Sequence, residues 1–490
     1  TDHPGVEIGR RHYPSGIAFQ NGPNSGRDVF IPIDWIIGGV DKAGQGWRML
    51  MECLGAGRSI SLPALSVGAS KFTSRTMGAY ARVRKQFRTP IGYFEGVEEP
   101  LTRIGANAYM MDAARVLTAA ALDQGESPSV LSAILKYNLT ERMRMAVNDA
   151  MDIQGGAGIC LGPHNILGKL YHALPIGITV EGANILTRSM IIFGQGAIRC
   201  HPYVLPEMQA AASSDRAQAS RQFDEAFTGH VGFTLSNVAR SLFLGLTGAR
   251  LSSVPVSGPS RRYLQAANRY SAAFALAADA AMLTLGGALK RKEKISGRFA
   301  DVLSLLYLLS ATVKQFEDNG RNDDELPLMR WSCEDALYRI QEALHEILRN
   351  LPNRPVAWIL RGLIFPLGRH RQAPRDELGQ RVARFLLSPS AARDRLTAGI
   401  HVPEDLNEPL GRLEYGIQHA PRADEIEKKL HVARKNGLID GLEFQETIDQ
   451  AVQQDVISQD DAAFIQEYNR IRRDIIAVDD FDATFGMRGA

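Results

Sequence analysis

Apolar residues recur at three- and four-residue spacing over most of the chain after residue 45, and this helical periodicity limits the possible folds more than any other feature. Before residue 200 it predicts five helices, over about 46–84 with an interruption or kink near Pro63, 101–123, 129–153, 165–174 and 183–193. One face of the second helix is apolar through Leu101, Ile104, Ala108, Met111 and Ala114. Gly155 and Gly156 act as a stop signal after the third helix, and Gly194 ends the last. Long helices joined by short loops predict an antiparallel helical bundle.

The chain on either side of this region differs in composition. Residues 1–40 are rich in glycine, proline and β-forming residues, and 15–19 and 28–33 are predicted to form short strands around a turn-rich segment. Residues 201–230 contain Pro202, Pro206 and a polar stretch of alanine and serine, which is typical of a boundary between domains. Beyond it, helices are predicted over 262–290, 298–316, 325–350, 375–387, 424–436 and 460–476.

Composition excludes several classes of protein. A chain of 490 residues should contain two or three domains. The net charge of +2 and the lack of a basic, aromatic-laced stripe give no reason to expect nucleic acid as a partner. The four cysteines form no CxxC pair, so we expect no metal cluster or disulfide framework, and a reducing cytoplasm fits. The best candidate for a membrane span, residues 272–289, is alanine-rich and contains Asp279, so a buried helix is the expected reading.

Glu181 is the most informative single residue. It ends the apolar run 176–180, and Gly182 follows it directly. Burial of a carboxylate raises its pKa because the charged form loses solvation, and a raised pKa suits a general base that removes a weakly acidic C–H proton. The glycine leaves room for close approach of a ligand to the backbone. On the residues alone, however, a Glu-Gly pair of this kind is also typical of a helix start or a turn.

Four other segments precede Glu181 in order: Gly44-Gln45-Gly46-Trp47, Gly57-Arg58, Arg84-Lys85-Gln86-Phe87-Arg88-Thr89-Pro90-Ile91-Gly92 and Asp152-Ile153-Gln154-Gly155-Gly156-Ala157-Gly158-Ile159. With this order and spacing, residues 1–200 resemble the C-terminal half of the acyl-CoA dehydrogenase family. The likeness is closest to the large proteobacterial members of fatty-acid β-oxidation, and residues 201–490 resemble their helical C-terminal extension.

The resemblance implies a mainly α fold in four parts. These are a small remnant of a middle β domain over 1–45, an acyl-CoA-dehydrogenase-type helical bundle over 46–200, a linker over 201–230 and an all-α extension over 231–490. It also implies that the N-terminal helical domain and most of the β domain are missing from this chain. A rival reading follows, in which the chain is a non-catalytic helical fragment that serves as an oligomerisation or interaction module.

The implied activity is FAD-dependent α,β-dehydrogenation of a medium- or long-chain acyl-CoA, with electrons leaving through an electron-transfer flavoprotein. Glu181 would take the α proton while the β hydrogen passes as hydride to the flavin, and its backbone N–H would hydrogen-bond the thioester carbonyl. The family places an arginine near this carboxylate, which here is Arg58, and a nearby cation would keep the base ionised. Without the resemblance, Arg58 would be read as a solvated arginine on a helix.

Two segments match the cofactor contacts of the family. Arg84, Gln86 and Phe87 match a segment whose arginine reaches the flavin pyrophosphate of a neighbouring subunit, which would require a homo-oligomer. The alternative is a solvated basic helix end favoured by the helix dipole. Gly155, Gly156 and Gly158 match a segment whose small residues let backbone amides approach the cofactor, a role compatible with a helix cap and turn.

Some residues depart from the family pattern. Asp152 stands where many relatives have glutamine, and a carboxylate there would repel a pyrophosphate. Ala183 and Ile185 replace polar residues that often contact the adenine in the family, so flavin binding is expected to differ in detail or to depend on the missing parts.

The run 358–371 combines dense apolar residues with a cluster of cations. It is read either as a buried helix end followed by a basic loop, or as a surface for a membrane or a lipid-bearing partner. In the second reading the protein would be cytoplasmic but peripheral to the inner membrane.

Overall fold

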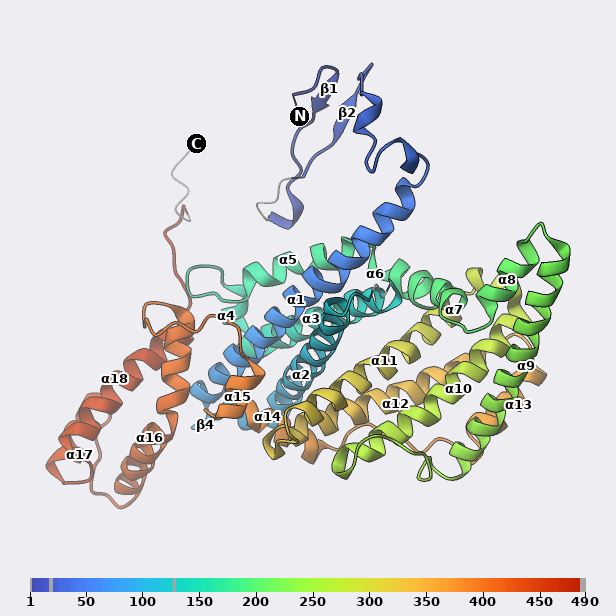
Figure 1. Cartoon of the computed structure of the whole chain (residues 1–490). Coiled ribbons are helices and arrows are strands. Elements are labelled where there is room, and N and C mark those ends of the chain that lie inside the picture. Colours follow the sequence, from blue (N-terminus) through green and yellow to red (C-terminus); the bar gives the residue numbers. More distant parts are fainter. Residues whose placement is uncertain (1, 17–20, 127–128, 485–490) are drawn as a thin grey trace. The chain divides into compact units, whose positions relative to one another are not determined.

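The computed structural model describes residues 2–16, 21–126 and 129–484 (Figure 1). The chain divides into two compact units, and each is described by itself. Unit 1 comprises Thr1–Val67, Tyr109–Met143 and His172–Pro374, and unit 2 comprises Gly68–Ala108, Arg144–Tyr171 and Arg375–Ala490. Most described residues are helical, which confirms the predicted mainly α fold.

Three long helices form the predicted bundle. They are α1 (Gly46–Val83), α2 (Glu95–Asp123) and α3 (Ser129–Gln154). α1 is assigned as one uninterrupted helix through Pro63, so the predicted interruption there is absent. The five apolar residues predicted to share a face of α2 are fully buried. α3 ends where predicted, because Gly155 takes a left-handed φ of 61°.

The N-terminal segment contains little regular structure. β1 (Val6–Ile8) pairs antiparallel with β2 (Asn24–Gly26), with Val6 opposite Gly26. The predicted strand over 28–33 is wrong. Asp28 takes a φ of 51°, Pro32 lacks a backbone N–H, and a 3-10 helix covers Ile33–Trp35. Ser15 and Gly16 of the other predicted strand lie in the 3-10 helix Pro14–Gly16, and residues 17–19 lie outside the described part.

α5 (Gly168–Thr179) leads to the Glu181 turn, and a continuous helix follows it. This helix consists of α6 (Asn184–Leu186), the π-helical segment Thr187–Gln195 and α7 (Gly196–Arg199). The predicted stop at Gly194 is therefore wrong. A Cβ on Gly194 would lie 3.9 Å from Ser296 Oγ, so the glycine lies close to a packed neighbour instead of ending the helix.

The rest of unit 1 is a layer of helices. Its members are α8 (Val204–Ala212), α9 (Arg216–Leu246), α10 (Arg261–Leu285), α11 (Glu293–Asp318), α12 (Leu326–Asn350) and α13 (Arg354–Ile364). The range 201–230, predicted as a linker, thus contains α8 and the first half of α9. Phe193 stacks on Phe299 with ring centroids 4.4 Å apart, and Phe274 meets both rings edge-on, so the π-helical segment shares a core with α10 and α11.

Two helices of this layer are long and apolar enough to cross a membrane, by length and composition alone. They are α10 with its flanking turns, Gly258–Arg291, and α11. In the structure α10 buries Arg269 and Asp279, and both helices contact other helices of unit 1. Much of each apolar surface is therefore used in packing within the protein.

Unit 2 adds α14 (Asp376–Leu386), α15 (Ala391–Leu396), α16 (Pro409–Lys435), α17 (Phe444–Gln453) and α18 (Gln459–Ile476). The predicted helix 424–436 covers only the last part of α16, which continues through Pro421. The last three helices share a buried core that includes Ile426, Ile448 and Ile465. In the bundle part of unit 2, the two-residue strands β3 (Lys85–Gln86) and β4 (Thr89–Pro90) form a hairpin directly after α1.

Candidate functional site

Glu181 lies at a sharp corner between α5 and α6. Its φ is 55°, and Gly182 follows with a φ of 96°, so two successive residues take left-handed backbone conformations. This conformation is unfavourable for a residue with a Cβ, and such strain is concentrated at functional sites. The side chain is half-buried, and its Oε2 atom is buried without a hydrogen-bond partner among the described residues. A carboxylate oxygen in this state can accept a proton or a hydrogen bond from a ligand.

Arg58 lies beside this corner on α1. Its side chain is only 8% exposed, and Nε is buried without a hydrogen-bond partner among the described residues. Its Nη2 atom would lie 3.7 Å from a Cβ built on Gly182, so the guanidinium contacts the corner directly. The structure therefore brings Arg58 and Glu181 together, and each has an unsatisfied buried polar atom.

The sequence reasoning missed Lys136, which holds the same corner from α3. Its Nζ atom donates to the carbonyl oxygens of Ile178 and Gly182 and to Asn184 Oδ1, at 3.2, 2.7 and 2.7 Å. Burial and the nearby Arg58 lower the pKa of Lys136 to about 8, although Glu181 and Glu141 act in the opposite direction. Its only signal in the sequence is a lysine directly after the apolar residues Ala133, Ile134 and Leu135, together with Asn184 shortly after the Glu-Gly pair.

Arg84 lies at the end of α1 in unit 2. Its Nη1 atom donates to the hydroxyl of Tyr80 at 2.5 Å, and that hydroxyl donates to the carbonyl oxygen of Gln154 at 3.4 Å. Gln154 is the last residue of α3, so Arg84 is connected through Tyr80 to the turn that begins at Gly155. Two of the segments predicted to contact a flavin are thus neighbours in unit 2.

The hairpin after α1 presents Gln86 and Phe87 to solvent. Phe87 and Arg88 form its turn with φ values of 49° and 63°, and Phe87 is 91% exposed. A large apolar side chain on a strained turn is poorly explained by the stability of one subunit. It suits a contact with another molecule.

The glycine turn is held by a side chain that the sequence reasoning did not use. The amide nitrogen of Asn165 donates to the carbonyl oxygens of Ala157, Gly158 and Cys160, and its Oδ1 accepts from two backbone N–H groups. Gly155 and Gly156 are exposed, and a Cβ at either would meet no atom within 4 Å. Open space of this kind fits a surface that a ligand approaches closely. Gly158 is buried and lies against Met151 instead.

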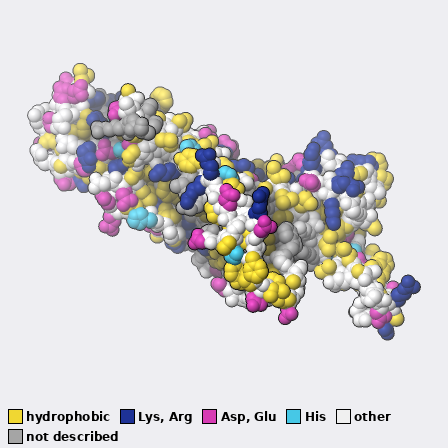
Figure 2. Space-filling model, turned by 90° about the horizontal axis from the view of Figure 1, so that it is seen from above, with side chains coloured by type: hydrophobic (Ala, Val, Ile, Leu, Met, Phe, Trp, Pro, Cys, Tyr) yellow, Lys and Arg dark blue, Asp and Glu magenta, His cyan; other side chains and the backbone are white. Residues whose placement is uncertain are grey.

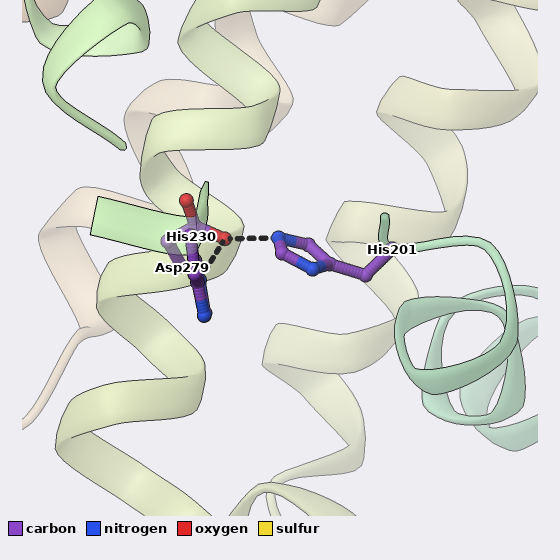
Figure 3. Close-up of side chains that lie close together, drawn as sticks. All are labelled: His201, His230 and Asp279. Atoms are coloured by element: carbon purple, nitrogen blue, oxygen red, sulfur yellow. Dashed lines mark hydrogen bonds and ion pairs between the residues drawn. The ribbon is translucent and has the colours of Figure 1, made fainter. Parts of the chain in front are cut away.

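A second polar cluster lies in unit 1, where His201, His230 and Asp279 place ligand atoms within 4.8 Å of one another (Figure 3). Two observations decide its chemistry. The Nδ1 atom of His201 accepts the backbone N–H groups of Tyr203 and Val204, both at 3.2 Å. The ring proton must then be on Nε2, which lies 3.0 Å from Asp279 Oδ1 and donates to it. A protonated Nε2 cannot bind a metal, so the cluster is a hydrogen-bonded junction of the turn before α8 with α9 and α10.

The predicted basic and apolar run begins in α13, on which Ala357, Leu360 and Ile364 are buried. Trp358 and Ile359 on the same helix are 66% and 64% exposed, so the run contains both a buried helix face and an exposed apolar one. On the face of the molecule in Figure 2, hydrophobic side chains gather in patches among charged side chains of both signs.

Comparison with known proteins gives two adjoining family matches. A family model described as acyl-CoA dehydrogenase, C-terminal, bacterial type, matches residues 198–481, which is more than half of the chain. A second, described as acyl-CoA dehydrogenase, C-terminal domain, matches residues 44–193. The two matched ranges are separated by four residues, 194–197.

Two curated proteins with different descriptions are each similar to part of this chain. Protein HemX of Proteus mirabilis is 58% identical over 79 residues, which is 16% of this chain and 46% of that protein. Probable acyl-CoA dehydrogenase FadE10 of Mycobacterium tuberculosis is 25% identical over 365 residues, 71% of this chain and 54% of that protein. The chain thus spans about half the length of these relatives. A solved acyl-CoA dehydrogenase from Bacillus anthracis, complexed with FAD, covers 79% of this chain and 64% of its own, with a TM-score of 0.60 and 18% identity.

Proposed function

This chain belongs to the acyl-CoA dehydrogenase family, and from that premise we propose that it carries the catalytic base of an FAD-dependent acyl-CoA dehydrogenase. The observation that carries the proposal is the Glu181 corner, where a strained backbone presents a carboxylate oxygen that is buried and unpartnered. Strain and an unsatisfied buried acceptor both cost stability, and a catalytic role accounts for their presence together.

Glu181 removes the α proton of the acyl thioester, which its free Oε2 atom accepts. The described residues give its backbone N–H no backbone acceptor, which leaves this donor available to the thioester carbonyl. Arg58, in contact with Gly182, places a cation beside the base and offers an unpartnered Nε donor. The exposed side chains of Val180, Ile185 and Leu186 border the corner and suit an apolar chain, in keeping with a medium- or long-chain substrate.

FAD, when bound, supplies the acceptor for the β hydrogen as hydride. Arg84 fits a phosphate of this cofactor, because a guanidinium held by Tyr80 at one nitrogen retains further N–H donors. The open Gly155–Gly156 backbone suits close approach of the same ligand. Asp152 is exposed near this turn, and we expect it to weaken a pyrophosphate contact there.

The partners follow from the same proposal. Phe87 on its strained turn suits a contact with the flavin site of a second copy, so we expect a homo-oligomer. An electron-transfer flavoprotein would accept the electrons. Trp358 and Ile359 suit a peripheral membrane contact of a cytoplasmic enzyme, which would bring it close to long-chain substrates.

The test of this proposal is Glu181→Gln, which keeps the size of the side chain and removes the base. We expect loss of acyl-CoA turnover by about three orders of magnitude or more, with the flavin absorbance of the purified protein unchanged. Glu404→Gln at an exposed site is the control and should leave turnover unchanged. Turnover of Glu181→Gln within twofold of the unmodified protein would refute the assignment of the base.

A non-catalytic helical module is the second candidate, and one observation favours it. α9 exposes large apolar side chains at helical spacing along its length: Phe223, Phe227, Val231, Leu235, Leu242 and Leu246. Such a stripe suits association with another protein. Purified chain that is colourless, takes up no added FAD and forms oligomers would favour the module. A flavin spectrum would favour the enzyme.

A further inference from the structure

The proposed reaction does not use Lys136, yet its ammonium group is the centre of the contacts at the Glu181 corner. The side chain is fully buried. An ammonium has three N–H donors, and Nζ has three acceptors at hydrogen-bond distance: Ile178 O, Gly182 O and Asn184 Oδ1. Each donor therefore has one acceptor. One acceptor precedes Glu181 in the sequence and two follow it.

Asn184 extends this arrangement back to α3. Its Oδ1 accepts from Lys136, and its amide nitrogen donates to Thr140 Oγ1 at 3.0 Å and to Glu141 Oε1 at 2.8 Å. Lys136, Thr140 and Glu141 are spaced i, i+4 and i+5, so they lie on one side of α3. One face of one helix thus fixes the backbone before Glu181, at Ile178, and after it, at Gly182 and Asn184.

A buried lysine is a costly way to hold a turn. Removing an ammonium from water is unfavourable, and an apolar residue of the same length often gives a more stable protein. Lysine is also one of the residues found least often in a fully buried position. The buried lysine is explained if fixing the geometry of the Glu181 corner is worth the loss of stability that a buried charge causes.

We infer that Lys136 is a positioning residue, which holds the strained Glu181–Gly182 corner in the conformation that presents the carboxylate to the substrate. This inference rests on the proposed function of Glu181. Lys136 acts through backbone carbonyl groups and through Asn184. Three charge-assisted hydrogen bonds oppose the relaxation of Glu181 and Gly182 to ordinary backbone conformations.

The first experiment measures amide hydrogen exchange in the unmodified chain, in Lys136→Met and in a matched control, Lys71→Met. Lys71 is also buried, and its Nζ atom donates to Ala398 O at 3.1 Å within unit 2. We expect exchange over residues 179–187 to be about tenfold faster in Lys136→Met and unchanged in Lys71→Met. Equal exchange in Lys136→Met and the unmodified chain, or equal acceleration by both variants, would overturn the inference.

The second experiment separates positioning from a general loss of folded protein. With an α-deuterated acyl-CoA, we expect Lys136→Met to lower kcat by about tenfold or more, leave KM within about threefold and raise the isotope effect on kcat. A loss of folded protein would lower the rate without changing the isotope effect, and that result would overturn the inference. If Lys136→Met does not fold, Asn184→Ala takes its place in both experiments, because it removes one of the three acceptors.

Different results would refute the assignment of Glu181 as the base and the positioning role of Lys136. Normal turnover of Glu181→Gln would refute the base assignment, while faster exchange of the corner in Lys136→Met would still establish the contact with the backbone. Unchanged exchange in Lys136→Met would refute the positioning role even if Glu181→Gln is inactive.

Discussion

Arg84 donates a hydrogen bond of 2.5 Å from its Nη1 atom to the hydroxyl of Tyr80. The guanidinium carbon also lies 5.8 Å from the centroid of the Tyr80 ring, within the range of a cation–π contact. Because the same hydroxyl donates to Gln154 O, one side chain orients the arginine and joins it to the end of α3. A change at Tyr80 should therefore act on flavin binding without removing a proposed flavin ligand.

Tyr80→Phe removes this hydroxyl and keeps the ring. We expect the free energy of unfolding to fall by about 1 kcal/mol, and FAD affinity to fall about fivefold because Arg84 loses its orientation. Urea unfolding and absorbance titration with FAD measure the two effects. Tyr307→Phe is the control, because its hydroxyl is hydrogen-bonded to Thr118 at 2.6 Å in unit 1. Tyr307→Phe should lower the free energy of unfolding by a similar amount and leave FAD affinity unchanged. If Tyr80→Phe binds FAD as tightly as the unmodified chain, the prediction is contradicted.

The helices could be predicted from the sequence because their signal is local. The apolar face of α2 and the stop at Gly155 follow from residue spacing and from glycine conformation alone. The failed predictions concern features that depend on distant contacts. The sequence predicts a helix stop at Gly194, but this glycine lies beside Ser296, which follows about a hundred residues later in the chain.

The residues of the candidate site also divide into those with a signal in the local sequence and those that depend on distant contacts. Glu181, Arg58, Arg84 and the glycine turn are predictable because the segments that contain them resemble those of a family. Lys136 could not be found in this way, because a lysine in a helix is normally solvent-exposed and its acceptors follow 42 to 48 residues later. Its role depends on a tertiary arrangement that residue spacing does not encode.

Glu414 is the centre of a buried ion-pair network in unit 2, and its replacement by glutamine should be costly. It accepts hydrogen bonds from Arg75 and from Arg393, whose side chain is fully buried. Glu414→Gln removes the carboxylate that pairs with buried Arg393 and leaves Arg75 paired with Asp394 alone, so we expect a loss of about 3–5 kcal/mol at neutral pH by urea unfolding. Glu467→Gln, which breaks the exposed pair with Arg470, should cost less than about 1 kcal/mol.

The pH dependence of the Glu414 effect has a definite sign. Burial alone would raise the pKa of Glu414, but the hydrogen bonds and charges of Arg393 and Arg75 outweigh it, and the pKa is lowered. The stabilisation is therefore present above the ordinary pKa of 4.5 and is lost as the pH falls through the folded value. We expect the stability difference between the unmodified chain and Glu414→Gln to shrink on acidification. A difference that stays constant from neutral pH to about pH 3 would contradict this.

Lys136 should give a pH dependence of the same sign in alkaline solution, because its folded-state pKa is also lowered. Burial and Arg58 lower its pKa from 10.5 to about 8, while Glu181 and Glu141 act to raise it. The unfolded chain then binds this proton more tightly than the folded one, so the cost of the buried charge is present below pH 8 and is relieved towards pH 10.5. Between these two pH values, the free energy of unfolding of the unmodified chain should rise by on the order of 3 kcal/mol relative to that of Lys136→Met. If the free energies of unfolding of the two proteins change with pH in the same way, the prediction is contradicted.

The histidine cluster around Asp279 should not respond to metal ions. Because His201 Nδ1 accepts two backbone N–H groups, its Nε2 is a donor, and a metal would have to displace this proton. We expect neither EDTA nor a micromolar excess of zinc to shift the melting temperature by more than about 1 °C. Asp279→Ala should lower stability by about 2 kcal/mol, because Thr234 and His201 lose a buried acceptor. A zinc-dependent rise in melting temperature that Asp279→Ala abolishes would show that the tautomer assignment is wrong.

The exposed apolar side chains of α13 give the last prediction, which concerns lipid. Trp358 and Ile359 project to solvent, and Arg361 is exposed on the same helix. Apolar side chains next to cations favour the interface of an anionic bilayer, where the apolar groups are buried and the charges face the headgroups. We expect co-sedimentation with vesicles of anionic phospholipid at low salt, and a fall of about tenfold in affinity when both residues are changed to serine. Leu442→Ser, at a leucine of unit 2 that is 95% exposed, should bind as the unmodified chain does. Equal binding by the double variant would assign these side chains to a protein contact instead.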